Sequence, residues 1–432
     1  MKGQRIALNQ EILTFLPLLE FDSYLSEDDK GQWIQFVKRF QQFTGPLMAK
    51  GFEDTTLYIH NRLLSLNEVG GFPQTFGISL EEFNDFIQNR NDVWPYALNP
   101  TSTHDTKRGE DVRARLNVLS ELPEEWEAKI REWSKINSTK KRKIDSLRAP
   151  DKNDEYFIYQ TLLGAFPFGD EDYPVFVERI QSYVVKAVRE AKVHTAWLKP
   201  DHAYEEACVS FVDRLLESSP QNQFLREFLP FQRKVAFYGI FNSLSQVLLK
   251  ATTPGVPDFY QGAELWDLNL VDPDNRRPVN FEKRRAMLGN INHGVRGDIS
   301  SFIAELLHTK EDGRIKLFLI HMALKARNQN PQVFCKGRYI PLEVAGKFRE
   351  HIVAFARNHR KSWTVTVAPR FLVALVSNGK YPVGPEVWHD TQVLLPEGSP
   401  MEWHNMLTGE VIGNSTAVRI GEVLQHFPVS LL

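Results

Sequence analysis

The interpretation of this chain depends on one stretch, Thr103-His104-Asp105-Thr106-Lys107-Arg108-Gly109-Glu110-Asp111-Val112-Arg113. No apolar residue interrupts it before Val112. Two prolines just before it, Pro95 and Pro100, exclude a regular helix there. After it, the spacing of Val112, Leu116 and Leu119 predicts a helix from Thr106 onward. The His104-Asp105 pair is therefore expected where a connection becomes a helix.

Residue types alone leave two interpretations of this stretch open. In the first, Asp105 or Thr106 caps the helix, and Asp111 pairs with Lys107 or Arg115, each four residues away, on a solvated surface. In the second, the dense polar block lines a pocket that binds a hydroxyl-rich ligand. The rest of the chain is needed to choose between them.

Composition narrows the class of protein. With 432 residues, 42% of them hydrophobic, the chain can bury a large core and is expected to form two domains. A net charge of −2 predicts neither a nucleic-acid partner nor a membrane partner. Two cysteines, Cys208 and Cys335, provide no disulfide framework and indicate a reducing compartment. No apolar run approaches the ~18 residues of a membrane span, so we expect a cytoplasmic location.

The first hundred residues mix helical and strand-like patterns. An apolar stripe at helical spacing predicts a helix within residues 1–45, and Gly45-Pro46 is expected to end it. Residues 47–55 then run from apolar side chains into Lys50, Glu53 and Asp54. This order is typical of a strand whose carboxyl end delivers polar groups, with a charged loop as the alternative. A further helix is expected from Ser79, with Glu82 completing a capping box.

The middle and the end of the chain differ in pattern. Residues 106–250 are predominantly helical in pattern and are predicted to form a helical insertion, because they are too long for a simple crossover. Helices are also expected at 281–292, 298–309 and 312–328. From about residue 331, alternation and turns predict an antiparallel sheet with strands near 352–356, 364–367, 391–395 and 406–412.

The stretch from Thr103 to Arg115 resembles the signature of maltooligosyltrehalose synthases, a family of the α-amylase clan of glycoside hydrolases. Ala49-Lys50-Gly51-Phe52-Glu53-Asp54-Thr55 and the run Asn67–Gly71 are similar to other segments of that family. Pro254-Gly255-Val256-Pro257, with Tyr260 and Gly262, resembles the eighth barrel strand of the clan and its loop.

This resemblance implies an α/β fold, namely the C-terminal part of a (β/α)8 barrel with a large helical insertion, followed by an antiparallel β domain. The implied boundaries are a partial barrel at 1–105, the helical insertion at 106–250, the last barrel strand with its helices at 251–330, and the β domain at 331–432.

The resemblance also implies roles for individual residues. Asp105 would stabilise the transition state, and His104 would bind the hydroxyls of the same sugar. Lys50 and Lys107 resemble lysines that line the acceptor subsite. Further expected contacts, or residues that support Asp105, are Arg108, Glu53, Asp54, Glu110, Asp111, Tyr260, Gln261, Asp274 and Arg276. Surface ion pairs remain an alternative for Glu110 and Asp111, as does core packing for Tyr260. Neither a metal nor another cofactor is expected.

The implied reaction converts the reducing-end α-1,4 link of a maltooligosaccharide into an α,α-1,1 link through a covalent glycosyl-enzyme. Such retaining enzymes need two carboxylates ~5–5.5 Å apart. In the clan both precede the His-Asp pair and follow barrel strands, with the nucleophile in an Arg-x-Asp motif. We expect neither this motif nor a strand-end Glu before Asp105. About four barrel strands are also missing, so we expect a complementary N-terminal chain that carries both groups. The alternatives are a noncatalytic α-glucan-binding remnant and another amylase-clan activity.

Overall fold

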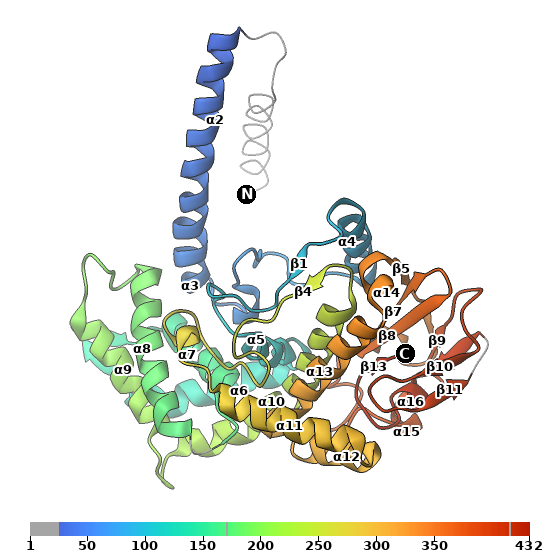
Figure 1. Cartoon of the computed structure of the whole chain (residues 1–432). Coiled ribbons are helices and arrows are strands. Elements are labelled where there is room, and N and C mark those ends of the chain that lie inside the picture. Colours follow the sequence, from blue (N-terminus) through green and yellow to red (C-terminus); the bar gives the residue numbers. More distant parts are fainter. Residues whose placement is uncertain (1–25, 170–171, 414–415) are drawn as a thin grey trace. The chain divides into compact units, whose positions relative to one another are not determined.

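The computed structural model describes residues 26–169, 172–413 and 416–432 (Figure 1). The chain divides into two compact units, Met1–Ile59 and His60–Leu432. The part of the predicted N-terminal helix that falls in residues 1–25 lies outside the described residues. Within the part of the chain that is described, no helix combines the length and the apolar character needed to cross a lipid bilayer.

The first unit is helical from Glu27 to Ile59. Helix α2 (Glu27–Leu47) begins after Ser26, whose hydroxyl accepts a hydrogen bond from the Asp29 amide. The helix was predicted to end at Gly45-Pro46, but it continues to Leu47. Just past the proline, the Met48 amide resumes the helical hydrogen bonds by donating to the Thr44 and Gly45 carbonyls.

The segment that follows α2 is not the predicted strand. It forms a π-helix, η2 (Met48–Thr56), and a short helix, α3 (Leu57–Ile59). The hydroxyls of Thr55 and Thr56 donate to the carbonyls of Lys50 and Gly51, at 2.8 and 3.1 Å. These side-chain bonds satisfy two backbone carbonyls within the wide helical turns. In an extended strand, the same carbonyls would need amide donors from a neighbouring strand.

The second unit contains the predicted helical region. Helix α4 (Leu80–Val93) starts with the predicted capping box of Ser79 and Glu82. The region 106–250 then contains α5 (Glu110–Asn117), α6 (Pro123–Ile136), α7 (Lys152–Ala165), α8 (Tyr173–Ala191), α9 (His202–Leu216) and α10 (Gln223–Thr252), with a hairpin of β2 (Arg142–Ile144) and β3 (Leu147–Ala149). Helix α10 is buried along most of its length and packs against α5 and α13, so it forms the centre of this unit.

The three helices predicted after residue 280 are confirmed as α11 (Phe281–Arg296), α12 (Ile299–His308) and α13 (Arg314–Gln329). A short helix, α14 (Pro331–Lys336), leads into the C-terminal strands. Figure 1 shows these strands, in orange and red, at one end of the second unit, with α8 and α9 at the other end.

The C-terminal region is antiparallel, as predicted. One sheet has the order β13-β8-β7-β5, from Ser430–Leu431, Ser362–Pro369, Ile352–His359 and Arg338–Pro341. A second has the order β12-β9-β6, from Ala417–Arg419, Gln392–Leu394 and Val344–Ala345, and β10 (Glu402–His404) pairs with β11 (Val411–Gly413). Two short helices, α15 (Pro385–Trp388) and α16 (Ile420–Val423), complete it. The strand predicted at 406–412 is only partly right, because Met406–Thr408 forms a turn.

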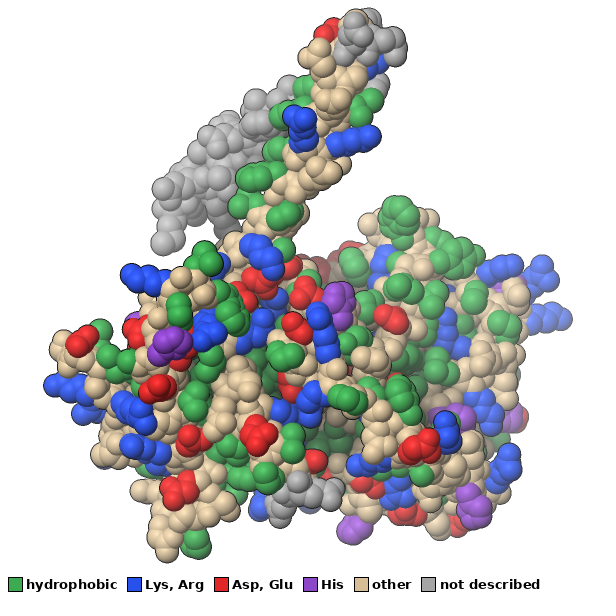
Figure 2. Space-filling model, turned by 60° about the vertical axis from the view of Figure 1, so that its left-hand side comes forward, with side chains coloured by type: hydrophobic (Ala, Val, Ile, Leu, Met, Phe, Trp, Pro, Cys, Tyr) green, Lys and Arg blue, Asp and Glu red, His purple; other side chains and the backbone are tan. Residues whose placement is uncertain are grey.

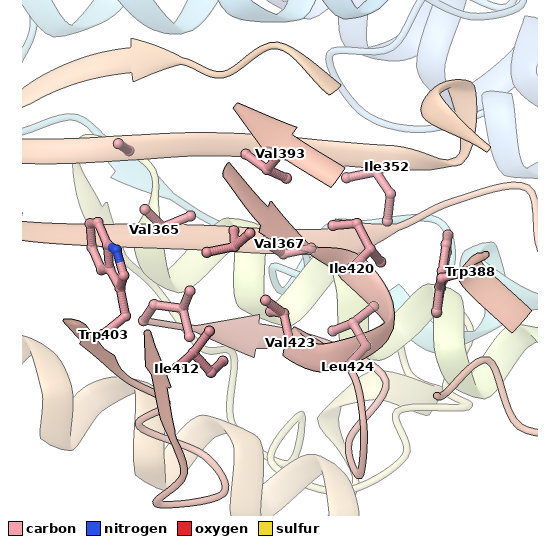
Figure 3. Packing of buried hydrophobic residues seen from close by; sticks show 14 residues of the cluster. Ile352, Val365, Val367, Trp388, Val393, Trp403, Ile412, Ile420, Val423 and Leu424 are labelled. Carbon is pink, nitrogen blue, oxygen red and sulfur yellow. The ribbon is translucent and has the colours of Figure 1, made fainter. Parts of the chain in front are cut away.

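A hydrophobic cluster holds these sheets together. Figure 3 shows Val365, Val367, Val393 and Ile420 gathered between the strands, with Trp403 and Trp388 toward opposite ends of the cluster. The alternation of β7 and β8 supplies this face, which is the pattern that predicted the strands.

The predicted partial barrel is not confirmed. Among the described residues, the parallel strands are β1 (Leu98–Asn99) and β4 (Val256–Pro257), which pair Leu98 with Val256 and Asn99 with Pro257. No closed barrel forms in the described parts of the chain, which are mostly helical with small sheets. This one parallel pair nevertheless positions the loops of the candidate site.

Candidate functional site

Two loops meet beyond the parallel pair. Because β1 and β4 run in the same direction, the loop after β1, which contains the His104-Asp105 pair, emerges next to the loop after β4. The Val271 amide donates to the Lys107 carbonyl at 3.1 Å, and the Gly109 amide donates to the Asn269 carbonyl at 2.8 Å. The side-chain amide of Asn275 donates to the His104 carbonyl at 3.0 Å. The two loops therefore form one hydrogen-bonded platform.

His104 and Asp105 lie at an exposed turn of this platform. The Thr106 hydroxyl donates to the Thr103 carbonyl at 2.9 Å, and the Asp105 amide donates to the Thr103 hydroxyl at 3.2 Å. These bonds close the turn and leave both candidate side chains accessible. The turn is thus suited to present an imidazole and a carboxylate to a ligand.

The helix after the turn starts later than predicted. Helix α5 begins at Glu110, with Gly109 at its N-cap, so neither Asp105 nor Thr106 caps it. The Ser102 hydroxyl accepts the Glu110 amide at 2.9 Å instead. The predicted start at Thr106 is therefore wrong. The Glu110 amide is bonded by Ser102, on the other side of the turn, and the spacing of apolar residues does not reveal this contact.

Glu110 and Asp111 are buried, which contradicts their interpretation as members of surface ion pairs. The Lys316 ammonium, from α13, lies 2.6 Å from Glu110 and 2.8 Å from Asp111. The Lys250 ammonium, at the end of α10, lies 3.2 Å from Glu110 and donates to the Thr101 hydroxyl at 2.6 Å. This cluster anchors both ends of the His104-Asp105 loop to the two central helices.

The buried charged groups of this cluster shift one another's pKa values. Burial alone would raise the pKa of Glu110, but the ammonium groups of Lys316 and Lys250 outweigh it and lower that pKa to about 2. Burial raises the pKa of Asp111 in spite of Lys316, and the Glu110 charge adds to the rise. Burial also raises the pKa of Asp267, whose carboxylate accepts the Ser102 hydroxyl at 3.0 Å. Glu110 is therefore the carboxylate that the lysines hold in its ionised form.

The buried Arg108 supports the loop from inside the protein. Its guanidinium donates to the Leu64 and Asn67 carbonyls at 3.3 and 3.4 Å and to the Tyr183 hydroxyl at 3.2 Å. The neighbouring Lys107 is buried as well. Because both side chains are buried, they are placed to hold the loop in position rather than to contact a ligand.

The candidates after β4 divide into two groups. The Asp274 carboxylate is buried and forms a bidentate pair with the Arg179 guanidinium, with both distances 2.7 Å. The Tyr260 hydroxyl donates to the Asn275 carbonyl at 3.2 Å. Both side chains thus hold the loop. Gln261 and Arg276 are exposed, and Arg276 pairs with Asp272 at 3.1 Å.

A cavity of about 640 Å³ opens beside this loop. Gln261, Trp266, Asn275 and Arg284 are among its lining residues. It combines an indole with amide and guanidinium donors, which is a chemistry suited to sugars. On the face shown in Figure 2, basic and acidic side chains are interspersed, so that face offers no continuous basic surface.

Lys50, Glu53 and Asp54 belong to the first unit. Within it, the Lys50 ammonium pairs with the Asp54 carboxylate at 2.6 Å, one helical turn apart. Glu53 lies in the same π-helix and is half-buried.

One group of side chains in the described residues has the composition of a metal site. Asp151, Asp154 and His194 place ligand atoms within 4.8 Å of one another. Each carboxylate already has protein partners, because Asp151 caps α7 and bonds the His194 ring at 2.8 Å, and Asp154 accepts the Tyr204 hydroxyl at 2.6 Å. These bonds explain the cluster without an ion.

The residues that sequence reasoning missed are Lys250, Lys316, Asp267, Arg179 and Glu68. Lys250 and Lys316 sit in helical patterns that look like ordinary helix surface. One signal was available for Lys250, because it is a single charge in the otherwise apolar run Val247–Ala251.

The solved structures that this chain resembles are maltooligosyltrehalose synthases. The protein from Arthrobacter ramosus matches with a TM-score of 0.76 and 32% sequence identity, over 91% of this chain and 46% of that chain. A second synthase structure matches with a TM-score of 0.71 and 31% identity, over 96% of this chain and 51% of that chain. The fold class is therefore that found within these synthases.

Sequence comparison agrees. A relative from Mycobacterium tuberculosis (strain CDC 1551 / Oshkosh), provisionally named a maltooligosyl trehalose synthase, is 36% identical over 395 residues, which are 91% of this chain and 45% of the relative. No protein-family model matches the sequence. The predicted resemblance is confirmed: the chain is a homologue of maltooligosyltrehalose synthases and spans about half the length of the relatives it matches.

The expectation that no Arg-x-Asp motif precedes Asp105 is wrong, because this spacing occurs once, at Arg90-Asn91-Asp92. These residues lie near the end of α4 and not after a strand, and the Arg90 guanidinium donates to the Pro254 carbonyl at 3.0 Å. We therefore do not assign Asp92 as the nucleophile.

Proposed function

We propose that this chain forms part of an enzyme that converts the reducing-end α-1,4 link of a maltooligosaccharide into an α,α-1,1 link. The observation that carries the proposal is the exposed His104-Asp105 turn, whose two ends are fixed by buried bonds. An ionised Asp105 would stabilise the charge of an oxocarbenium-like transition state, and His104 would bind hydroxyls of the same sugar. This chemistry needs no cofactor.

We assign the other candidates to two roles within this proposal. Of the two lysines that the resemblance assigns to the released glucose, Lys50 in the first unit would keep this role, whereas the buried Lys107 would support the turn. In the second unit, contacts to the remaining sugars would come from the exposed Gln261 and Arg276. Support of the turn would come from the buried or bonded residues Arg108, Glu110, Asp111, Tyr260 and Asp274.

We also propose a complementary N-terminal chain that carries the nucleophile and the acid/base. Leu98 on β1 is 63% exposed and Val256 on β4 is 42% exposed, and Trp94 and Tyr96, just before β1, are exposed as well. Each of these two strands pairs with the other alone among the described strands. Apolar side chains beside unpaired strand edges fit a partner that adds further strands to this pair.

The decisive experiment measures the loss of reducing ends from maltopentaose. The chain is assayed alone and after co-expression with the upstream half of a homologous synthase. We expect loss only in the mixture, and we expect Asp105→Asn to abolish it. Asp145→Asn is the matched control, because Asp145 is exposed in the β2–β3 turn at φ 53, which asparagine tolerates.

Other outcomes support other functions. Binding of maltopentaose without activity in either sample would favour a noncatalytic α-glucan-binding protein. Activity that raises the number of reducing ends would indicate another amylase-clan reaction, namely hydrolysis. A cytoplasmic location belongs to the same proposal, because Cys208 and Cys335 are both free thiols.

A further inference from the structure

We propose that Glu68 is a positioning residue for Asp105, acting through a reciprocal clamp between residues 64–69 and residues 107–108. The inference rests on the proposed function of the His104-Asp105 turn. Glu68 belongs to the run Asn67-Glu68-Val69-Gly70-Gly71. The glycines of this run are explained by the turn that they form, but the carboxylate of Glu68 is not.

The carboxylate of Glu68 binds the backbone immediately after the turn. Its Oε1 accepts the Lys107 amide at 2.6 Å, and its Oε2 accepts the Arg108 amide at 3.2 Å. The same Oε1 accepts the Val69 amide at 2.8 Å, and the Arg113 guanidinium lies 3.6 Å from Oε2. Glu68 is only 8% exposed, so these charge-assisted bonds form largely out of water and are correspondingly strong.

The clamp is reciprocal because Arg108 reaches back. Its guanidinium donates to the carbonyls of Leu64 and Asn67, which precede Glu68 in the chain. Each segment therefore supplies a side chain that binds the backbone of the other, with residues 107–108 as the donors and residues 64–69 as the acceptors. Deleting either side chain would remove hydrogen bonds to buried backbone groups of the opposite segment.

The segment that carries Glu68 is itself fixed to the helical region. The Leu64 amide donates to the side chain of Gln160 on α7 at 2.9 Å, and the Gln160 side-chain amide donates to the Asn61 carbonyl at 3.0 Å. The Asn67 side chain donates to the His60 carbonyl at 2.7 Å. Glu68 thus holds the loop against a rigid support rather than against another loop.

The clamp determines where the Asp105 carboxylate points. Asp105 is exposed, so the direction of its carboxylate depends on the backbone of the turn and not on packing around the side chain. Glu68 fixes that backbone two and three residues further along. A carboxylate is required there, because glutamine would place an N–H₂ group opposite one of the two amides.

Amide hydrogen exchange on the intact chain tests the clamp without any activity. In Glu68→Gln we expect exchange of the Lys107 and Arg108 amides to rise about 10- to 100-fold, with α10 unchanged. The matched control is Glu121→Gln, because Glu121 also accepts a distant amide, that of Val373 at 3.0 Å. Wild-type exchange of the loop amides in Glu68→Gln would overturn the clamp. If that variant does not fold, Glu68→Asp is used, with an intermediate rise as the expected result.

Kinetics of the co-expressed enzyme then test positioning. In Glu68→Gln we expect kcat to fall about 100-fold with KM within about twofold, because misplacement of Asp105 affects the transition state more than ground-state binding. We expect Glu68→Asp to recover part of kcat and Glu121→Gln to leave it unchanged. A loosened loop with wild-type kcat would overturn the positioning role. A wild-type mixture without activity would instead overturn the proposed function, and the exchange comparison would still decide the clamp.

Discussion

Replacing Lys316 by methionine tests the buried charge cluster that anchors the candidate site. The side chain is fully buried, and its ammonium lies 2.6 Å from Glu110 and 2.8 Å from Asp111. Methionine fills a similar volume but removes the charge. Breaking a buried ion pair from one side costs about 3–5 kcal/mol. Here Asp111 would lose its ammonium partner, and Glu110 would keep only Lys250. We therefore expect Lys316→Met to lower the free energy of unfolding by about that amount at pH 7.

The pKa of Glu110, which Lys316 and Lys250 lower together, gives a second magnitude for the cluster as a whole. Its decrease from 4.5 to about 2 corresponds to about 3 kcal/mol of stability. Because the folded-state pKa is depressed, this contribution is fully present above pH 4.5 and is lost as the pH falls toward 2. The raised pKa of Asp111 acts in the opposite direction and reduces the net effect. The difference between wild type and Lys316→Met should therefore shrink in acid.

Urea unfolding followed by far-UV circular dichroism at pH 7 and pH 3.5 measures both effects. The matched control is Lys186→Met, because Lys186 is only partly buried and pairs with Glu190 at 3.4 Å along one helix. That substitution is expected to cost about 0.5 kcal/mol or less. Adding Glu110→Gln to Lys316→Met should recover part of the loss. A loss below about 1 kcal/mol at pH 7, or a loss that does not decrease in acid, would refute this account of the cluster.

Three further predictions concern separate parts of the chain. Gly109→Ala is expected to destabilise by about 1–3 kcal/mol in urea unfolding, because a Cβ there would lie 2.5 Å from the Asp267 carbonyl oxygen; an unchanged midpoint would contradict the close packing. Ser79→Ala should cost about 1 kcal/mol through loss of the cap of α4, and Ser79→Asp should retain most of the stability. Ellman's reagent should label the exposed Cys335 in the native protein. Cys208 should react only after unfolding, because it is buried and its burial raises the pKa of its thiol. Rapid labelling of both thiols in the native protein would contradict the burial of Cys208.

The helices and C-terminal strands were predictable because their hydrophobic periodicity is local. The apolar face of α8 and the strand patterns of β7 and β8 are written in consecutive residues. The structure buries that face of α8 and both faces of the two strands along most of their length. The strand expected after Gly45-Pro46 was wrong, because composition alone does not reveal that threonine hydroxyls can satisfy helical carbonyls at that point. The turn at Met406–Thr408 was missed in the same way, inside a run that looks like a strand.

The candidate site was only half visible in the sequence. The polar stretch from Thr103 to Arg113 identified the exposed pair His104-Asp105, and it did so through its residue types and its resemblance to maltooligosyltrehalose synthases. The same stretch could not show which of its charges face inward, because Glu110 and Asp111 have the composition of a solvated helix start.

The sequence by itself thus determined the helical and β-rich regions, the resemblance and the position of the candidate pair His104-Asp105. Tertiary structure alone decided the supporting residues, since Lys316 meets Asp111 across 205 residues and Lys250 meets Glu110 across 140. The physical reason is that a buried charge must be neutralised by whichever opposite charge the fold brings near, and such a partner leaves no periodic signal in the chain. Glu68 follows the same rule, because the amides that it binds lie 39 and 40 residues away.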